Sequence, residues 1–99
     1  FESLGRFPAV RRDLALIVDE SVSIEQICQE INESSGLLLD NCRIFDIYQG
    51  EGIEKGKKSI ALGLTFRDSS RTLVDTEIND IVHGVVESLQ RRFNATLRA

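Results

Sequence analysis

The chain has 99 residues, of which 41% are hydrophobic, and a formal net charge of −4 at pH 7. Residues 1–99 are therefore expected to form a single domain around one hydrophobic core, because two cores need a longer chain. The negative charge argues against indiscriminate binding to nucleic acid, and no apolar run approaches the roughly 20 residues that cross a bilayer, which argues against a membrane protein.

Residues 9–18 are expected to form the first strand, because apolar side chains alternate along it. Its apolar face comprises Leu14, Leu16 and Val18. The segment Ser23–Gln26 then has the pattern of a capping box, and apolar residues follow at helical spacing from Ile24 to Ile31. A helix is therefore expected to begin at Ser23 and to end at the Ser-Ser-Gly sequence of residues 34–36.

A second strand is expected within residues 37–48 and a third over residues 58–66, joined by a hairpin that contains three glycines. The hairpin has a superficial similarity to a phosphate-binding loop. Its glycine spacing is wrong, however, and a strand follows it where a phosphate cradle needs the N-terminus of a helix. The sequence therefore favours a turn.

Asp75 is expected to cap a second helix, whose apolar stripe runs from Ile78 to Phe93, and Asn94 has the conformational freedom to end it. Residues 95–98 are expected to form a short last strand. The order strand, helix, strand, strand, helix, strand predicts an α+β, ferredoxin-like βαββαβ fold: a four-stranded antiparallel sheet with two helices on one face.

The alternation of side chains assigns the residues of each strand to one of the two faces of this sheet. The helix-covered face is expected to carry Leu16, Phe45, Ile47, Leu62 and Leu64. The open face is expected to carry Ala15, Asp46, Tyr48, Ser59, Ala61, Gly63 and Arg98. Small residues beside one aromatic ring and several polar groups suggest a shallow recognition surface. The same pattern is also typical of the solvent-exposed face of any two-layer α+β domain.

The residues argue against catalysis and against a metal site. His83 is the only histidine, and Asp46 has no carboxylate near it in the sequence for acid–base chemistry, so no catalytic residue is expected. One histidine and two cysteines, Cys28 and Cys42, at this spacing do not make a zinc site. With so few cysteines, a reducing, cytoplasmic compartment is expected. An RNA-recognition module with aromatic residues on its third strand is disfavoured, because the open-face positions there are small or polar.

Four segments of the chain resemble one known family. They are residues 7–16, 45–50, 56–59 and 95–98. Together they are similar to the C-terminal anticodon-binding domain of phenylalanyl-tRNA synthetases, more closely to the bacterial β-subunit form than to the single-chain organellar form. The resemblance implies a ferredoxin-like fold. With the absence of methionine, it also leads us to expect that the chain is the C-terminal fragment of a longer one.

The resemblance implies that the domain binds the anticodon stem-loop of tRNA(Phe) and recognises the guanine at the first anticodon position. Tyr48 would stack on that base, Asp46 and Ser59 would bond its edge, Ala15 would line the pocket, and Arg98 would touch the RNA. From the hairpin, Lys57 and Lys58 are further candidates for contacts with phosphates.

The resemblance also implies partners and cofactors of a parent enzyme, a phenylalanine–tRNA ligase. The partners would be the remainder of the β subunit and the catalytic α subunit. ATP and Mg²⁺ would act in the parent enzyme, and no cofactor is expected in this domain. The alternative is a small-molecule-binding regulatory module on the same fold. A small phosphatase is disfavoured for want of a phosphate-binding loop.

Overall fold

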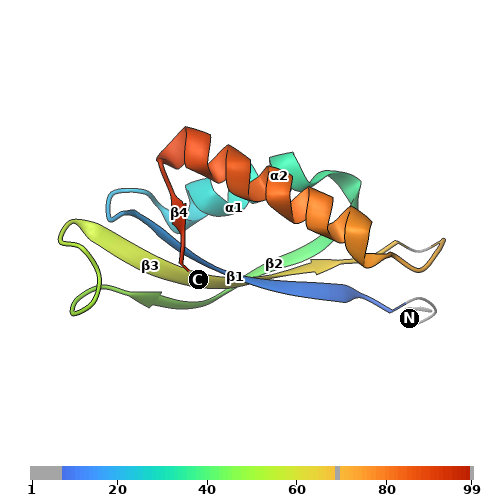
Figure 1. Cartoon of the computed structure of the whole chain (residues 1–99), viewed down its shortest axis with the longest axis horizontal. Coiled ribbons are helices and arrows are strands. Elements are labelled where there is room, and N and C mark those ends of the chain that lie inside the picture. The colour runs from blue at the N-terminus through green and yellow to red at the C-terminus, as the bar shows by residue number, and fades with distance from the viewer. Residues whose placement is uncertain (1–7, 69, 99) are drawn as a thin grey trace.

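The computed structural model describes residues 8–68 and 70–98. Its elements in chain order are β1 (Val10–Asp19), α1 (Ile24–Ser35), the 3₁₀ turn η1 (Gly36–Leu38), β2 (Leu39–Tyr48), β3 (Lys57–Phe66), α2 (Asp75–Phe93) and β4 (Thr96–Leu97). The four strands pair antiparallel in the order β2–β3–β1–β4. Both helices cover the same face of the sheet (Figure 1). The ferredoxin-like βαββαβ fold is therefore confirmed.

The core lies between the helix layer and the two central strands. β1 and β3 pair along their whole length, from Val10 opposite Phe66 to Asp19 opposite Lys57. The fully buried apolar side chains of the strands are Leu16, Val18, Ile60, Leu62, Leu64 and Phe66, and those of the helices are Ile27, Ile31, Ile78, Val85 and Leu89. Apolar side chains at helical spacing in α1 and α2 thus pack against the apolar side chains of alternate residues in β1 and β3. Burial of this apolar layer stabilises the packing of the helices on the sheet.

The N-terminus of α1 has the expected capping box. The Ser23 hydroxyl oxygen accepts a hydrogen bond from the backbone N–H of Gln26 at 3.1 Å, and the Gln26 side-chain oxygen accepts one from the backbone N–H of Ser23 at 2.9 Å. Two backbone donors that the helix cannot satisfy are thereby bonded. The helix ends before Gly36, whose φ of 78° is in the region that favours glycine.

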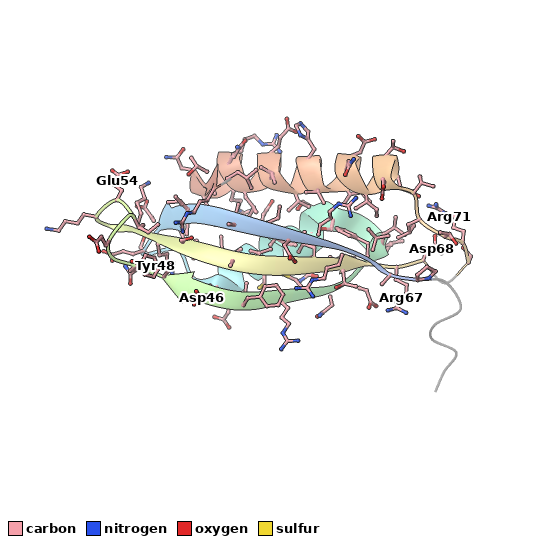
Figure 2. All side chains as sticks on the ribbon, turned by 60° about the horizontal axis from the view of Figure 1, so that its bottom comes forward. Asp46, Tyr48, Glu54, Arg67, Asp68 and Arg71 are labelled. Carbon is pink, nitrogen blue, oxygen red and sulfur yellow. The ribbon has the colours of Figure 1, made fainter. Side chains whose placement is uncertain are left out.

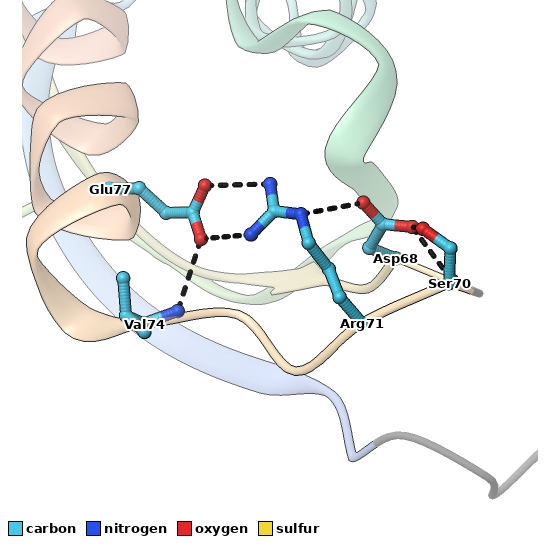
Figure 3. Close-up of polar contacts among 5 residues, drawn as sticks. All are labelled: Asp68, Ser70, Arg71, Val74 and Glu77. Carbon is cyan, nitrogen blue, oxygen red and sulfur yellow. Dashed lines mark hydrogen bonds and ion pairs between the residues drawn. The ribbon is translucent and has the colours of Figure 1, made fainter.

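The N-terminus of α2 differs from the expectation. Val74, not Asp75, occupies the N-cap position, and the carboxylate of Glu77 accepts the backbone N–H of Val74 at 3.1 Å. Asp75 instead makes an ion pair with Arg12 of β1 at 3.3 Å. Glu77 is held in place by Arg71, whose guanidinium donates to both of its carboxylate oxygens at 2.6 and 2.8 Å (Figure 3). The loop before α2 therefore supplies the partner that orients the capping group.

Strand β2 departs from simple alternation, and the expectation for Phe45 was wrong. Ile44 pairs with Leu62, and Asp46 pairs with Ala61. Leu62 and Ala61 are consecutive in β3, whereas one residue, Phe45, separates their partners in β2. Phe45 is therefore an extra residue at a β-bulge. Its ring lies against Gly63 on the open face and is 46% exposed. Ile47 pairs with buried Ile60 and does face the helix side, but at this edge strand it is 47% exposed and stays outside the core.

The C-terminal elements return the chain to the sheet. Asn94 adopts the left-handed conformation that ends α2, with φ 56° and ψ 32°, and Ala95 is buried behind it. β4 then pairs with β1 through Leu97 opposite Leu16 and Thr96 opposite Ile17. The backbone N–H of Arg98 bonds the carbonyl of Ala15 at 2.6 Å, which brings Arg98 beside the middle of β1.

Candidate nucleic-acid interface

Two adjacent rows of residues cross the open face of the sheet. In one row Asp46, Ala61 and Ala15 lie side by side on β2, β3 and β1. In the next row Tyr48 lies beside Ser59, and Ser59 beside Ile17. Figure 2 shows Asp46 and Tyr48 on the side of the sheet away from the helices. Residues that are far apart in the sequence are therefore brought together by strand pairing alone.

These rows border a shallow hollow of about 490 Å³, a volume in the range of small-ligand sites. Its lining residues are Ala15, Asp46, Tyr48, Ser59, Ala61 and Arg98. Five of the six are the residues that the sequence singles out as the candidate site, and Ala61 was expected on the same face. Ala15 and Ala61 form a low floor, so a flat molecule could approach the sheet closely between the polar groups.

A hydrogen bond to the hairpin orients the ring of Tyr48. Its hydroxyl donates a hydrogen bond to the backbone carbonyl of Glu51 at 2.8 Å, although 42% of the residue is exposed. The hairpin that provides this carbonyl is itself bonded, with the N–H of Ile53 donating to the Gly50 carbonyl at 3.0 Å and the side chain of Gln49 donating to Glu20 at 2.9 Å. The aromatic plane is thus a prearranged platform at the edge of the hollow.

Ser59 lies next to Tyr48 in the hollow, and Arg98 reaches it from the β4 side of the sheet. Ser59 is only 5% exposed, and its hydroxyl oxygen accepts a hydrogen bond from Nη1 of Arg98 at 3.1 Å. Because a hydroxyl both accepts and donates, Ser59 keeps its proton for a ligand acceptor. Among the six lining residues Asp46 is the one carboxylate and Arg98 the one cation. The hollow therefore offers acceptors, a donor and a positive charge around a flat apolar floor.

The two hairpin lysines lie on different sides of the sheet. Lys57 pairs with Asp19 at the end of β3, on the open side by register, and its ammonium is 3.9 Å from the Asp19 carboxylate. Lys58 pairs with buried Val18 and so belongs to the helix side. Neither lysine lines the hollow.

Phe45 is the open-face residue that sequence reasoning missed. Strict alternation gives no signal of a bulge, because it assigns Phe45 to the face opposite Asp46. The guanidinium carbon of Arg11 lies 4.7 Å from the centroid of the Phe45 ring, and that of Arg43 lies 6.0 Å from it. A second aromatic group with two cations therefore lies on the same face as Tyr48.

A cluster of metal-binding side chains and a membrane-spanning helix are both absent from the described part of the chain. No group of three or more metal-binding side chains of His, Cys, Asp or Glu occurs among residues 8–68 and 70–98. In the same ranges, neither helix is long and apolar enough to cross a membrane.

Comparison with known proteins identifies the domain. A family described as the ferredoxin-fold anticodon binding domain matches residues 5–98 of the chain. The chain belongs to this family. In the structure of this anticodon binding domain, each of the four segments that carry the resemblance supplies at least one residue to the hollow. These residues are Ala15, then Asp46 with Tyr48, then Ser59, and finally Arg98.

Curated relatives of this anticodon binding domain are β subunits of phenylalanine–tRNA ligase. The protein from Coxiella burnetii is 50% identical over 100 residues, which cover all of this chain and 13% of that protein. Those from Pseudomonas fluorescens Pf-5 and Acinetobacter baylyi are 48% and 43% identical, over 99% and 100% of this chain and 12% of each relative. The chain thus spans about an eighth of the length of these relatives.

Proposed function

We propose that the open face of this domain binds the anticodon loop of tRNA(Phe) and recognises the guanine at its first anticodon position. The observation that carries the proposal is the hollow itself, in which a phenol ring, a carboxylate and a hydroxyl surround a floor of two alanines. Proteins recognise RNA sequence mainly at unpaired loop bases, whose edges and faces are accessible. A shallow, flat-floored hollow with polar groups at its rim suits such a base.

Asp46 would provide the preference for guanine. An ionised carboxylate only accepts hydrogen bonds, and guanine presents two adjacent donors, N1–H and N2–H, on its Watson–Crick edge. Adenine presents an acceptor, N1, in the corresponding place, so its edge would face the carboxylate unfavourably. Ser59, whose hydroxyl proton is available, would bond an acceptor of the same base.

Tyr48 and Arg98 would provide most of the affinity. Stacking of a base on an aromatic side chain contributes about 1–3 kcal/mol. Arg98, which is bonded to Ser59, would contact the RNA backbone, and Lys57, on the open side, would contact a phosphate. With a net charge of −4, the domain would depend on these local contacts rather than on its overall field.

The domain would act as part of a phenylalanine–tRNA ligase β subunit. Its partners would be the rest of that subunit and the catalytic α subunit, which together attach phenylalanine to tRNA in the cytoplasm. ATP and Mg²⁺ would be used in the parent enzyme, away from this domain. The names of the relatives, at 43–50% identity over 99–100% of this chain, support the assignment.

The proposal is tested by titrating the 99-residue chain with anticodon stem-loop RNAs that differ only at the first anticodon position. We expect GAA to bind roughly tenfold or more tightly than AAA, because hydrogen bonds to a charged group contribute about 1.5–3 kcal/mol. Binding should also weaken steeply as the salt concentration rises. Equal affinity for the two hairpins would contradict guanine recognition.

The Asp46→Ala variant sharpens the test. It should reduce the preference for GAA over AAA towards parity while thermal unfolding stays close to that of the unmodified chain, since Asp46 is exposed. Glu54→Ala, in the hairpin and outside the hollow, removes the same charge and should leave the preference unchanged. A regulatory module that binds a small molecule would show no response to either hairpin.

A further inference from the structure

A second cluster on the open face lies beside the hollow and is centred on Phe45. The ring rests directly against the backbone of β3: a Cβ on Gly63 would lie 2.8 Å from its Cε2 and 2.9 Å from its Cζ. Residues that surround the ring line a smaller hollow of about 100 Å³. They are Arg11, Asn41, Arg43, Gly63 and Thr65. Glycine at position 63 is what lets the aromatic ring approach the backbone of β3 so closely.

Two arginines from different strands converge on this ring. Arg11 on β1 stacks on it at 4.7 Å and is also bonded to Asp13, with its Nε 3.0 Å from the carboxylate. Arg43 on β2 lies 6.0 Å from the ring centroid and, within the described residues, has no carboxylate partner within 4.0 Å. Guanidinium groups bind phosphate and stack on aromatic faces and bases. The cluster therefore combines a stacking surface with at least one cation available to an anion.

The two clusters are close neighbours on the open face. Gly63 is two residues from Ala61 on β3, which is about 7 Å along the strand, and Phe45 is three residues from Tyr48, at most about 10 Å. Both rings are on the same face, and no element of the described fold lies between them. Proteins that hold single-stranded nucleic acid place successive bases on successive aromatic side chains in this manner.

We propose that the Phe45 cluster binds the nucleotide adjoining the guanine held at Tyr48, with its base on the Phe45–Arg11 stack and its phosphate on Arg43. This inference rests on the proposed function and extends it from one base to two successive nucleotides. The guanine is recognised by its edge at Asp46, whereas the neighbouring nucleotide is held by stacking and charge. The second subsite therefore adds affinity and orients the loop without specifying which base occupies it.

The test uses Arg43→Gln in the 99-residue chain, with Arg91→Gln in the last turn of α2 as a control of equal charge. Arg43→Gln should weaken binding of the GAA hairpin about fivefold or more. It should also lower the slope of log affinity against log salt by about 0.7, the value for one phosphate contact of a single strand. The preference for GAA over AAA should remain. Affinity and slope equal to those of Arg91→Gln would overturn the proposal.

Phe45→Leu tests the stacking part of the subsite. The RNA change replaces one of the two nucleotides that flank the guanine by an abasic nucleotide. In the unmodified chain, this change should weaken binding about fivefold or more at one of the two flanking positions. In Phe45→Leu the same RNA change should cost little, because the stacking surface is already absent. An equal cost in both proteins, with GAA preference intact, would overturn the second subsite alone. If the unmodified chain does not prefer GAA over AAA, the proposed function is overturned as well.

Discussion

Tyr48 is an exposed residue whose ring is oriented by a hydrogen bond. Its ring lies on the open face of an edge strand, yet its hydroxyl is bonded to the Glu51 carbonyl of the adjoining hairpin at 2.8 Å. A side chain that is already oriented loses less conformational freedom when a ligand stacks on it. The Glu51 carbonyl therefore contributes to the site by orienting the ring of Tyr48.

Replacement of Tyr48 separates the stacking plane from its anchor. Tyr48→Ala should weaken binding of the GAA hairpin by about 1–3 kcal/mol, because the platform is lost. Its free energy of unfolding should change by about 1 kcal/mol or less, since the ring contributes little to the core. Tyr48→Phe keeps the plane and loses only the bond to Glu51, so it should lose less affinity. Calorimetric titration and urea unfolding measure the two quantities. Reduced stability with unchanged affinity would contradict the assignment.

At the residue scale, the sequence predicted most of the candidate hollow but not its neighbour. Alternation of side chains assigns each strand's residues to a face independently, so an error in one strand does not pass to the next. The sequence could therefore place four residues on the open face, namely Ala15, Asp46, Tyr48 and Ser59. Phe45 was misplaced because a bulge leaves no mark in the alternation of apolar and polar residues. The bulge depends on hydrogen bonds between strands, which a single sequence does not report.

At the element scale, the two helices begin in different ways. α1 is capped by the local pattern of Ser23 and Gln26, and the sequence predicted it correctly. The cap of α2 was assigned to Asp75, but the bonded group is Glu77, which Arg71 holds from six residues earlier. Asp68 also pairs with Arg71, at 3.3 Å. A cap that depends on a loop arginine cannot be inferred from the short-range pattern alone.

The Glu77 cap should make stability depend on pH. The bond from Arg71, and then that from the Val74 N–H, lower the pKa of Glu77 from its usual 4.5 to about 2. Because the folded pKa lies below the unfolded one, the ionised carboxylate stabilises the fold fully above about pH 4.5. This contribution is lost as the pH falls through about 2. Glu77→Gln should therefore lower Tm at pH 6 and flatten the decline of Tm between pH 5 and pH 2.

A control helix position tests whether this decline is specific. Asp80→Asn removes a carboxylate from the same helix at an exposed position that, among the described residues, has no ion pair. Its curve of Tm against pH should keep the slope of the unmodified chain. If the Glu77→Gln curve also runs parallel to that of the unmodified chain, the carboxylate does not have the role assigned to it.

At the scale of the whole molecule, the domain is a sheet with one covered and one uncovered face. Both helices cover one face of the sheet (Figure 1). The apolar core lies on that side, and the dimensions are 46 × 25 × 22 Å. Element order, helix stripes and the central strands were predictable, because burial imposes a period of two on strands and 3.6 on helices. The edge strand β2 was less predictable, since even its helix-side residues are only half-buried, as Ile44 is, or exposed, as Ile47 is.

The reactivity of the two cysteines measures whether the helix layer stays packed on the sheet. Cys28 of α1 and Cys42 of β2 lie with their sulfur atoms 4.0 Å apart, and burial, together with the neighbouring Cys28 thiol, raises the pKa of Cys42 to about 12. Little reactive thiolate is therefore present at pH 8. Alkylation of Cys42 by iodoacetamide, followed by peptide mass spectrometry, should be slow in native buffer and become fast across the urea transition. Fast labelling of Cys42 in native buffer would show that the helix layer opens locally.

The extra residue in β2 changes how densely one strand can display its side chains. A regular strand turns every second side chain inward, so six residues present three groups outward. Here Arg43, Phe45, Asp46 and Tyr48 all project from the uncovered face within six residues, two of them in immediate succession. With this one inserted residue, six residues of β2 present four side chains on the uncovered face, where a regular strand would present three.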